Sequence, residues 1–303
     1  MQVVFCGDNN IAKPVAVVLA SISNVCEEKK DLKITIVGIN WSQQEINFVK
    51  AAAPTIEVEF VSANHIKLPI VRKGRHVTAA AYLTLYLPEL LPDSKKILYL
   101  DHDVLIRDDR FFSLWDIPLD NKLLAAVPTI GVPFIGSKKG IPNWRDLGLD
   151  PQARMFNSGI VLFDLERCRK ENLTKRAVQY AESEGHNTRL ADQQTLNVVL
   201  NGNWKSLPLI FNAAMKVLND NSGVFSLWKK EDVEIARDNP CIVHFLGGSK
   251  PWHLKCKTKF TSEWRDVASL LGWYPWKEKQ SIGTRFNIFF KNNLRNIYKK
   301  ISK

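Results

Sequence analysis

Short apolar runs alternate with stretches of helical periodicity along the first hundred residues of the chain. The runs are rich in Val, Ile, Leu and Phe and are bounded by charged or turn-forming residues, which is typical of β-strands. Predicted strands cover residues 2–6, 33–39, 57–61 and 96–100, and predicted helices cover residues 15–25, 42–51 and 78–90. This alternation favours an α/β fold with a mostly parallel central sheet and helices on both faces.

The pattern continues more loosely in the second half of the chain. Further strands are predicted at 123–127, 159–164 and 241–245, with helices near 170–183 and 192–200 and a loop at 128–148. Such sheets bind ligands at the carboxyl ends of their strands, so the residues after each strand are candidates for a site. We expect one domain over residues 1–256 and a Trp-rich linker with a tail over residues 257–303.

The tail carries most of the chain's net positive charge. Lys and Arg total 42 against 31 Asp and Glu, a net charge of +11, and seven of the basic residues but no acidic one lie in 279–303. Apolar residues recur there at three- and four-residue steps, opposite most of the basic ones. We expect a basic amphipathic C-terminal helix that binds an anionic membrane surface. A helix docked on the protein's own core is the alternative.

Composition excludes several other classes of protein. The 303 residues are 45% hydrophobic and 24% charged, as in globular proteins and unlike disordered or fibrous chains. No basic stripe with interleaved aromatic residues precedes the tail, so nucleic acid is not an expected partner. There is no apolar stretch of membrane-spanning length and no secretion signal, and the five cysteines are scattered. We expect reduced thiols and a cytoplasmic protein, peripheral on the inner face of the cell membrane.

Two carboxylates follow the predicted strand at 96–100. Asp101 and Asp103 flank His102, where an apolar strand reaches solvent. Carboxylates on alternate residues repel one another unless a cation joins them, and their oxygens suit Mg²⁺ or Mn²⁺, which also hold diphosphates. A solvated acidic turn is the alternative interpretation.

A second group follows the last predicted strand. His244 ends the apolar run, and Gly247 and Lys250 come shortly after it. An imidazole is a suitable third ligand for Mn²⁺, glycines let the backbone approach a phosphate, and a lysine supplies charge to it. A structural histidine before an ordinary turn would give the same local pattern. The combination with the paired carboxylates favours a metal and phosphate site.

The first strand leads into a third candidate site, a polar turn at residues 7–10 that precedes the first helix. Turns at this position hold a base and ribose in many α/β proteins. The alternative is an Asx turn in which Asp8 caps the helix.

Five segments together resemble glycosyltransferase family 8. They are residues 5–10 (FCGDNN), 97–105 (ILYLDHDVL), 156–162 (FNSGIVL), 191–197 (ADQQTLN) and 244–253 (HFLGGSKPWH). The order and approximate spacing match over about residues 1–256, and the basic tail resembles that of the family's bacterial lipooligosaccharide α-galactosyltransferases. The resemblance implies a GT-A fold, Mn²⁺, and retaining transfer of a hexose from a UDP-sugar to a glycan acceptor. A lipopolysaccharide core or another lipid-linked saccharide would suit a membrane-bound tail.

The resemblance also implies roles for individual residues. The metal ligands would be Asp101, Asp103 and His244, with Asp101 also near the ribose. The residues that bind the nucleotide would be Cys6, through its backbone, Asp8 and Asn10 at the uridine, and Gly247 and Lys250 at the diphosphate.

At the sugar end, the resemblance places Asn157, Asp192 and Gln193 around the transferred hexose, with Gln193 on the face opposite the leaving group. An amide is a poor nucleophile, which argues against a covalent intermediate on Gln193. We expect same-face attack, in which the acceptor hydroxyl gives its proton to the departing diphosphate. A covalent adduct on Asp192 is the competing mechanism.

Two positions depart from the galactosyltransferase pattern. Thr84 stands where an arginine is usual, and Thr129 stands where an aspartate often contacts the sugar. Because groups that hydrogen-bond a substrate hydroxyl discriminate strongly, we expect a donor other than UDP-galactose.

Two other functions remain open. An apolar strand followed by Asp-x-Asp also resembles the nucleophile motif of haloacid-dehalogenase-type phosphohydrolases, although that motif usually opens its domain. A non-catalytic, peripheral protein that binds nucleotide-sugars is the second alternative.

Overall fold

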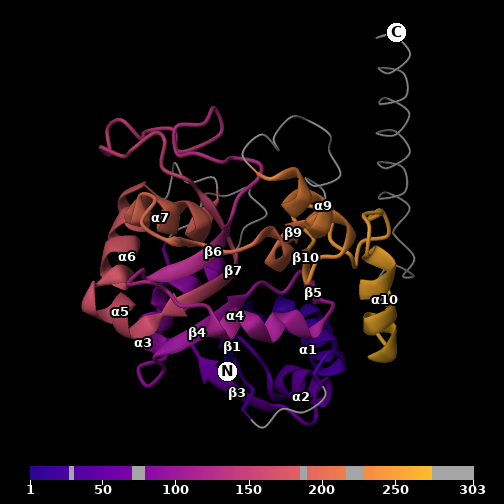
Figure 1. The fold of residues 1–303 in the computed structure, drawn as a ribbon. Coiled ribbons are helices and arrows are strands. Elements are labelled where there is room, and N and C mark those ends of the chain that lie inside the picture. Colours follow the sequence, from indigo (N-terminus) through magenta and orange to yellow (C-terminus); the bar gives the residue numbers. More distant parts are fainter. Residues whose placement is uncertain (27–30, 70–78, 185–189, 216–227, 275–303) are drawn as a thin grey trace, which may run out of the picture.

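The computed structural model describes residues 1–26, 31–69, 79–184, 190–215 and 228–274 and is built around a seven-stranded sheet (Figure 1). The strand order is β3-β2-β1-β4-β7-β6-β8. The strands are β1 (Gln2–Asp8), β2 (Lys33–Ile39), β3 (Glu57–Ser62), β4 (Lys96–Leu100), β6 (Leu124–Pro128), β7 (Phe156–Asp164) and β8 (Lys205–Ser206). Only β7 runs antiparallel to its neighbours, so the predicted mostly parallel α/β fold is confirmed.

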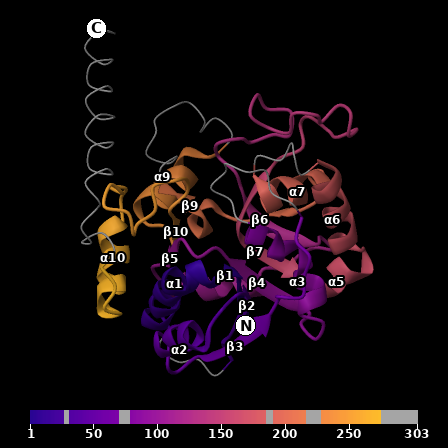
Figure 2. The ribbon, with the colours of Figure 1, turned by 180° about the vertical axis from the view of Figure 1, so that it is seen from behind.

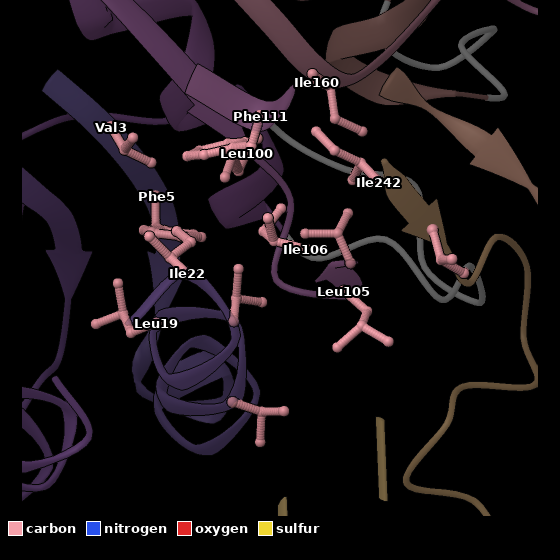
Figure 3. Close-up of a cluster of buried hydrophobic side chains, with 14 of the residues drawn as sticks. Val3, Phe5, Leu19, Ile22, Leu100, Leu105, Ile106, Phe111, Ile160 and Ile242 are labelled. Atoms are coloured by element: carbon pink, nitrogen blue, oxygen red, sulfur yellow. The ribbon is translucent and has the colours of Figure 1, made fainter. Parts of the chain in front are cut away.

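The central strands are buried on both faces because their apolar runs alternate between two cores. In β1, Val3 and Phe5 join the core that includes α1 (Ala12–Asn24), and Val4 and Cys6 join the core on the opposite face. Figure 3 shows Val3 and Phe5 lying close to α1. The second core is covered by α5 (Leu165–Lys170), α6 (Leu173–Glu184) and α7 (Ala191–Leu200).

A second sheet of three short strands closes one side of the molecule. It consists of β5 (Val104–Ile106), β10 (Ile242–His244) and β9 (Ala213–Ala214), in that order. β5 and β10 are antiparallel, and their register sets Val104 opposite His244. The sequence does not predict this sheet, although it is what brings the late strand beside the end of β4.

Two of the predicted helices differ in form from the structure. The segment at 170–183 spans parts of α5 and α6, which are separated at Asn172, whose φ of 52° is left-handed. Over the described part of 78–90 the chain forms a 3₁₀ helix, η2 (Ala79–Tyr86), and then the short α3 (Leu87–Leu90). Pro88 has no backbone N–H to donate to the preceding turn, so it interrupts a continuous α-helix.

The described residues form further helices. They are α2 (Gln43–Ala51), α4 (Ser113–Asp116), α9 (Lys230–Asp238), α10 (Thr261–Leu270) and the 3₁₀ turns η1 (Asn9–Ile11), η3 (Asp109–Phe112) and η4 (Leu209–Phe211). Figures 1 and 2 show α10 on the side of α1, away from α5 and α6.

Residues beyond 256 contribute to the same packed core. Trp264 of α10 is fully buried in the core that contains α1, and its ring lies 5.7 Å from that of Trp252 and 5.5 Å from that of Trp273. Within the described residues, no helix is both long and apolar enough to cross a membrane. The predicted basic amphipathic helix at 279–303 falls outside the described residues. All five cysteines are free thiols, as expected.

Candidate active site

The two predicted acidic ligands lie at the junction of the two sheets. Asp101 directly follows β4, and its backbone N–H donates to Gly159 O of β7 at 2.7 Å. Asp103 directly precedes β5, and its backbone carbonyl accepts from Phe245 N–H at 3.0 Å. The change of sheet between these two residues therefore sets both carboxylates at one point.

His244 completes a compact cluster with these carboxylates. Its Nε2 lies 3.1 Å from Asp103 Oδ1 and 3.6 Å from Asp101 Oδ2. One ligand atom from each residue lies within 4.8 Å of the other two. Asp103 and His244 are only 3% and 1% exposed, so the cluster is shielded from solvent on its protein side.

Two atoms of this cluster are buried without a hydrogen-bond partner, namely Asp103 Oδ1 and His244 Nε2. A buried polar atom left unpaired costs about 1–3 kcal/mol, so native proteins rarely retain one without a function. Carboxylate oxygens and an imidazole nitrogen are suitable ligands for a divalent cation. These residues therefore fit a metal ion.

Lys250 is a cation in direct contact with the cluster. Its Nζ forms an ion pair with Asp103 Oδ2 and donates to Phe245 O at 3.1 Å. Burial alone would raise the pKa of Asp103, but the neighbouring His244 and Lys250 outweigh it and hold that pKa below its usual range. Asp103 is therefore a carboxylate at neutral pH.

Gly159 of β7 leaves room for the cluster. A Cβ at this position would overlap His244 Cε1 and would lie only 2.7 Å from Asp101 Oδ2. Any side chain here would push apart two of the three candidate ligands. Gly159 lies in the family-like segment 156–162, but its role becomes clear only from the close approach of β7 to β10.

Tyr99 holds the other oxygen of Asp101. The two residues alternate along the chain at the end of β4, and Tyr99 OH donates to Asp101 Oδ1 at 2.7 Å. Burial, followed by the charge of Asp101, raises the pKa of Tyr99, so the phenol keeps its proton. Asp101 Oδ2 is thereby left facing His244.

A cavity of about 590 Å³ adjoins the cluster and collects most of the predicted donor-binding residues. The predicted site residues in its lining are Asp8, Asn10, Asp101, Asp103, Asn157, Asp192, Gln193 and Lys250. They come from β1, η1, the β4–β5 junction, β7, α7 and the segment after β10. The structure therefore places residues from all five family-like segments around one cavity.

Asp8 caps a helix and also lines the cavity. Its Oδ1 accepts from Asn10 N–H at 3.1 Å, which makes it the cap of η1, as the Asx-turn alternative predicts. Both residues nevertheless line the cavity.

The first turn of α7 lines the end of the cavity that is predicted to hold the sugar. Thr84 Oγ1 donates to Asp192 Oδ2 at 3.3 Å, so the residue at the unusual position 84 contacts an acidic wall of the cavity. Burial, followed by the charge of Asp101, raises the pKa of Asp192 to about 7. Asp192 is therefore partly protonated at neutral pH.

Five residues named from the sequence do not line this cavity, namely Cys6, Thr84, Thr129, His244 and Gly247. The Cys6 thiol is buried, and burial followed by the charges of Asp192 and Asp101 raises its pKa. Gly247 is exposed and has a left-handed φ of 88°, between the lining residues Leu246 and Lys250. Thr129 follows β6, where its backbone N–H donates to Met155 O at 2.9 Å.

Sequence reasoning missed several residues of the site. Trp252 stacks on His102 with centroids 5.9 Å apart, and both line the cavity. Asn212 lies against His244 and shows no motif in the sequence. Tyr99 could have been found, because alternate residues of a strand share a face and Asp101 follows it by two.

Comparison with solved structures defines the class of fold. The crystal structure of the galactosyltransferase LgtC in complex with donor and acceptor sugar analogs matches with a TM-score of 0.76 and 22% identity, covering 93% of this chain and 98% of that one. The fold is therefore of the GT-A type.

Sequence comparison identifies the family. Residues 2–256 match the profile of glycosyl transferase family 8. General stress protein A of Bacillus subtilis (strain 168) is 27% identical over 282 residues, which cover 90% of this chain and 94% of that protein. A putative glycosyltransferase of Haemophilus influenzae is 26% identical over 257 residues, which cover 84% of this chain and 74% of that protein. The chain belongs to glycosyltransferase family 8.

Proposed function

We propose that this protein transfers a hexose from a UDP-sugar to a glycan acceptor, with retention of the anomeric configuration and with Mn²⁺ as cofactor, Mg²⁺ being a substitute. The observation that carries the proposal is the pair of buried, unpartnered atoms on Asp103, which lines the cavity, and on its neighbour His244. In a member of glycosyltransferase family 8, these two atoms would bind a cation that lies between the nucleotide and the sugar.

The metal end of the proposed site binds the diphosphate. Asp101, Asp103 and His244 would hold the cation, which when bound neutralises charge on the departing diphosphate. Lys250, which is paired with Asp103, would also interact with the negative charge of the diphosphate. Gly247 would let the backbone approach the diphosphate closely. Uridine would lie along Asp8 and Asn10, with the Cys6 backbone beside it.

The sugar end favours same-face attack. Glycosyl transfer develops positive charge at the anomeric carbon, which the carboxylate form of Asp192 would stabilise. Gln193 Oε1 already accepts from Asn157 Nδ2 at 2.8 Å and from Ser158 N–H at 3.3 Å, and an amide is a poor nucleophile. The acceptor hydroxyl would attack on the face that UDP leaves and pass its proton to the diphosphate.

A covalent intermediate on Asp192 is the mechanism that would replace this one. Partial protonation of Asp192 lowers its nucleophilicity, which supports same-face attack. Mass spectrometry of the enzyme after rapid quenching with a UDP-sugar should show no glycosylated Asp192. A trapped adduct would establish double displacement.

The donor is proposed to differ from UDP-galactose. Thr84 bonds Asp192 where an arginine would bring a positive charge, so the acidic wall of the sugar site has no cationic partner there. Hydrolysis of a panel of UDP-glucose, UDP-galactose and UDP-N-acetylhexosamines measures the preference. Strict selection of UDP-galactose would contradict the proposal.

The acceptor is proposed to be a lipid-linked saccharide such as a lipopolysaccharide core, reached from the inner face of the cell membrane. The support for this is the charge and periodicity of residues 279–303. Deletion of 279–303 should release the protein from vesicles that contain anionic lipid. Membrane binding that survives the deletion would remove the tail as the anchor.

The test of the function itself compares UDP release with and without Mn²⁺ in the wild type and in Asp103→Ala. Release from one donor that requires the metal and is lost in the variant supports the transferase. Nucleotide binding without release from any donor, even with acceptor glycans present, would favour the non-catalytic binding protein. The GT-A fold gives no support to the phosphohydrolase alternative.

A further inference from the structure

Four side chains connect the metal end of the cavity with its sugar end. His244 Nδ1 lies 2.9 Å from Asn212 Oδ1, and Asn212 Nδ2 donates to Asn157 Oδ1 at 2.8 Å. Asn157 Nδ2 then donates to Gln193 Oε1, also at 2.8 Å. Hydrogen bonds thus run without a gap from a candidate metal ligand to a residue of the sugar site.

The backbone of β7 fixes the direction of these hydrogen bonds. A side-chain amide can be turned either way, whereas a backbone N–H can only donate. Ser158 N–H donates to Gln193 Oε1 at 3.3 Å, and Gly159 N–H donates to Asn157 Oδ1 at 3.1 Å. Both amides must therefore keep their oxygens on these N–H groups, and Asn212 must present its NH₂ group to Asn157.

This direction decides which nitrogen of His244 can bind a cation. With its NH₂ group on Asn157, Asn212 turns its carbonyl oxygen to His244, and a carbonyl only accepts. Nδ1 must then carry the proton, and Nε2 is the nitrogen that offers a lone pair. Nε2 is also the atom that lies 3.1 Å from Asp103 Oδ1 without a hydrogen-bond partner.

The backbone around Asn212 holds its side chain beside His244. It lies between η4 and β9, is only 3% exposed, and its backbone N–H donates to Leu209 O at 3.0 Å. Two residues later, Ala214 pairs with His244 in parallel register. Asn212 does not line the cavity, so any effect it has on substrate passes through His244 and Asn157.

We propose that Asn212 is a positioning residue that aims His244 Nε2 at Asp101 and Asp103 and, through Asn157, orients the Gln193 amide at the sugar. One side chain would thereby couple metal binding to the geometry of the transfer site. The inference rests on the proposed function, because its effect on turnover requires a cation at His244.

Two substitutions separate the two hydrogen bonds of Asn212. Asn212→Leu removes both, whereas Asn212→Asp keeps an acceptor for His244 Nδ1–H but places a carboxylate against Asn157 Oδ1. Thr35→Val is the matched control, because Thr35 is fully buried on β2, accepts a partly buried hydrogen bond from Gln2 Nε2 at 2.9 Å, and lies outside the cavity lining.

Mn²⁺ affinity is measured by electron paramagnetic resonance on the full chain, with and without UDP, beside melting temperature. We expect Asn212→Leu to bind Mn²⁺ about 10- to 100-fold more weakly, the usual effect of losing a group that orients a ligand. Asn212→Asp should stay within about threefold of the wild type in Mn²⁺ affinity, yet lose about tenfold or more in kcat for UDP release. Thr35→Val should melt earlier with unchanged Mn²⁺ affinity.

Equal Mn²⁺ affinity in wild type and Asn212→Leu would overturn the proposal. So would an Asn212→Asp variant that keeps its kcat, a result that remains informative if Asn212→Leu does not fold. A change in KM alone would also contradict it, because the proposed effect on Gln193 acts on turnover.

A measurement without metal separates this inference from the proposed function. In long-range ¹H–¹⁵N spectra of the metal-free protein with labelled histidine, the neutral His244 ring should carry its proton on Nδ1, and Asn212→Leu should lose that preference. A proton on Nε2 in the wild type would overturn the inference. If the wild type binds no Mn²⁺, the proposed metal site fails instead, and the spectra alone decide the role of Asn212.

Discussion

The two ends of the cavity are built in different ways. At the metal end, Asp101, Asp103 and His244 are fixed by strand pairing, and Lys250 and Tyr99 partner the two carboxylates. At the sugar end, Asp192 is carried by the first turn of α7 and is bonded by a hydroxyl from η2 at 3.3 Å.

The difference is visible in the charges of the two ends. Burial raises the pKa of both carboxylates, but His244 and Lys250 outweigh it at Asp103 and hold that pKa below its usual range. At Asp192 the charge of Asp101 adds to burial, and the pKa rises to about 7. We expect the strand-built metal end to serve the departure of the diphosphate, which is the same for every UDP-sugar. We expect donor preference to depend on the sugar end, where one or two side chains can change without disturbing the strands.

The largest expected effect tests whether the metal end serves every donor. Asp103→Asn removes a ligand oxygen from a buried cluster, so metal-dependent UDP release should fall by about a thousandfold or more for each UDP-sugar. Steady-state assays across the donor panel measure this. Loss of one donor with retention of another would break the distinction between the two ends.

Asp192→Asn should stabilise the protein while it impairs transfer. The folded state holds the pKa of Asp192 at about 7 against an ordinary value of 3.8, so the unfolded chain gives up this proton first as pH rises. The free energy of unfolding of the wild type should therefore fall between about pH 4 and pH 7, by at most about 4 kcal/mol.

In Asp192→Asn this fall should be absent, so the variant should be the more stable protein at pH 7 and above. Urea unfolding of both proteins from pH 4.5 to 8 measures the difference. Parallel curves would show that Asp192 titrates normally and that the two ends do not differ in charge.

Gly159→Ala tests the strand-built metal end by geometry alone. The added methyl would overlap His244 and crowd Asp101, so Mn²⁺ affinity should fall about 10- to 100-fold. Gly131→Ala is the control, because a Cβ there meets nothing within 4 Å. Unchanged Mn²⁺ binding in Gly159→Ala would mean that His244 is not a ligand in this position.

The smallest expected effect concerns the phenol beneath Asp101. Tyr99→Phe removes the 2.7 Å hydrogen bond to Oδ1 and leaves the carboxylate freer to rotate, so Mn²⁺ affinity should fall about three- to tenfold. Titration calorimetry is sensitive enough for this difference. A loss as large as that of Gly159→Ala would show that Asp101 depends on one hydrogen bond and not on the strand.

Much of the fold was accessible from the sequence because it rests on local pattern. The strands at 33–39 and 96–100 match β2 and β4, since apolar runs buried on both faces are bounded by polar residues. The form of the helix expected at 78–90 was harder to predict. Pro88 interrupts it because proline has no backbone N–H to donate, and the spacing of apolar residues does not reveal this effect.

The candidate site divides in the same way. Asp101, Asp103 and His244 were expected as ligands, and the structure brings them together, while their metal binding stays a prediction. Asn212 had no signal, because an asparagine after an apolar turn is common and its partner His244 is 32 residues away. No pattern in the sequence assigned an individual role to Gly159. A glycine is required there because His244, on the other sheet, occupies the space that a Cβ would take.

By itself the sequence determined the α/β class, the strand-end position of the candidate ligands and the family, because strands and motifs are set by residues close together in the chain. Only the tertiary structure decided which ring nitrogen of His244 faces the carboxylates, and why the pKa of Asp192 is raised. Those properties depend on hydrogen bonds and charges between segments that meet only when β7, β9, β10 and α7 pack around the cavity.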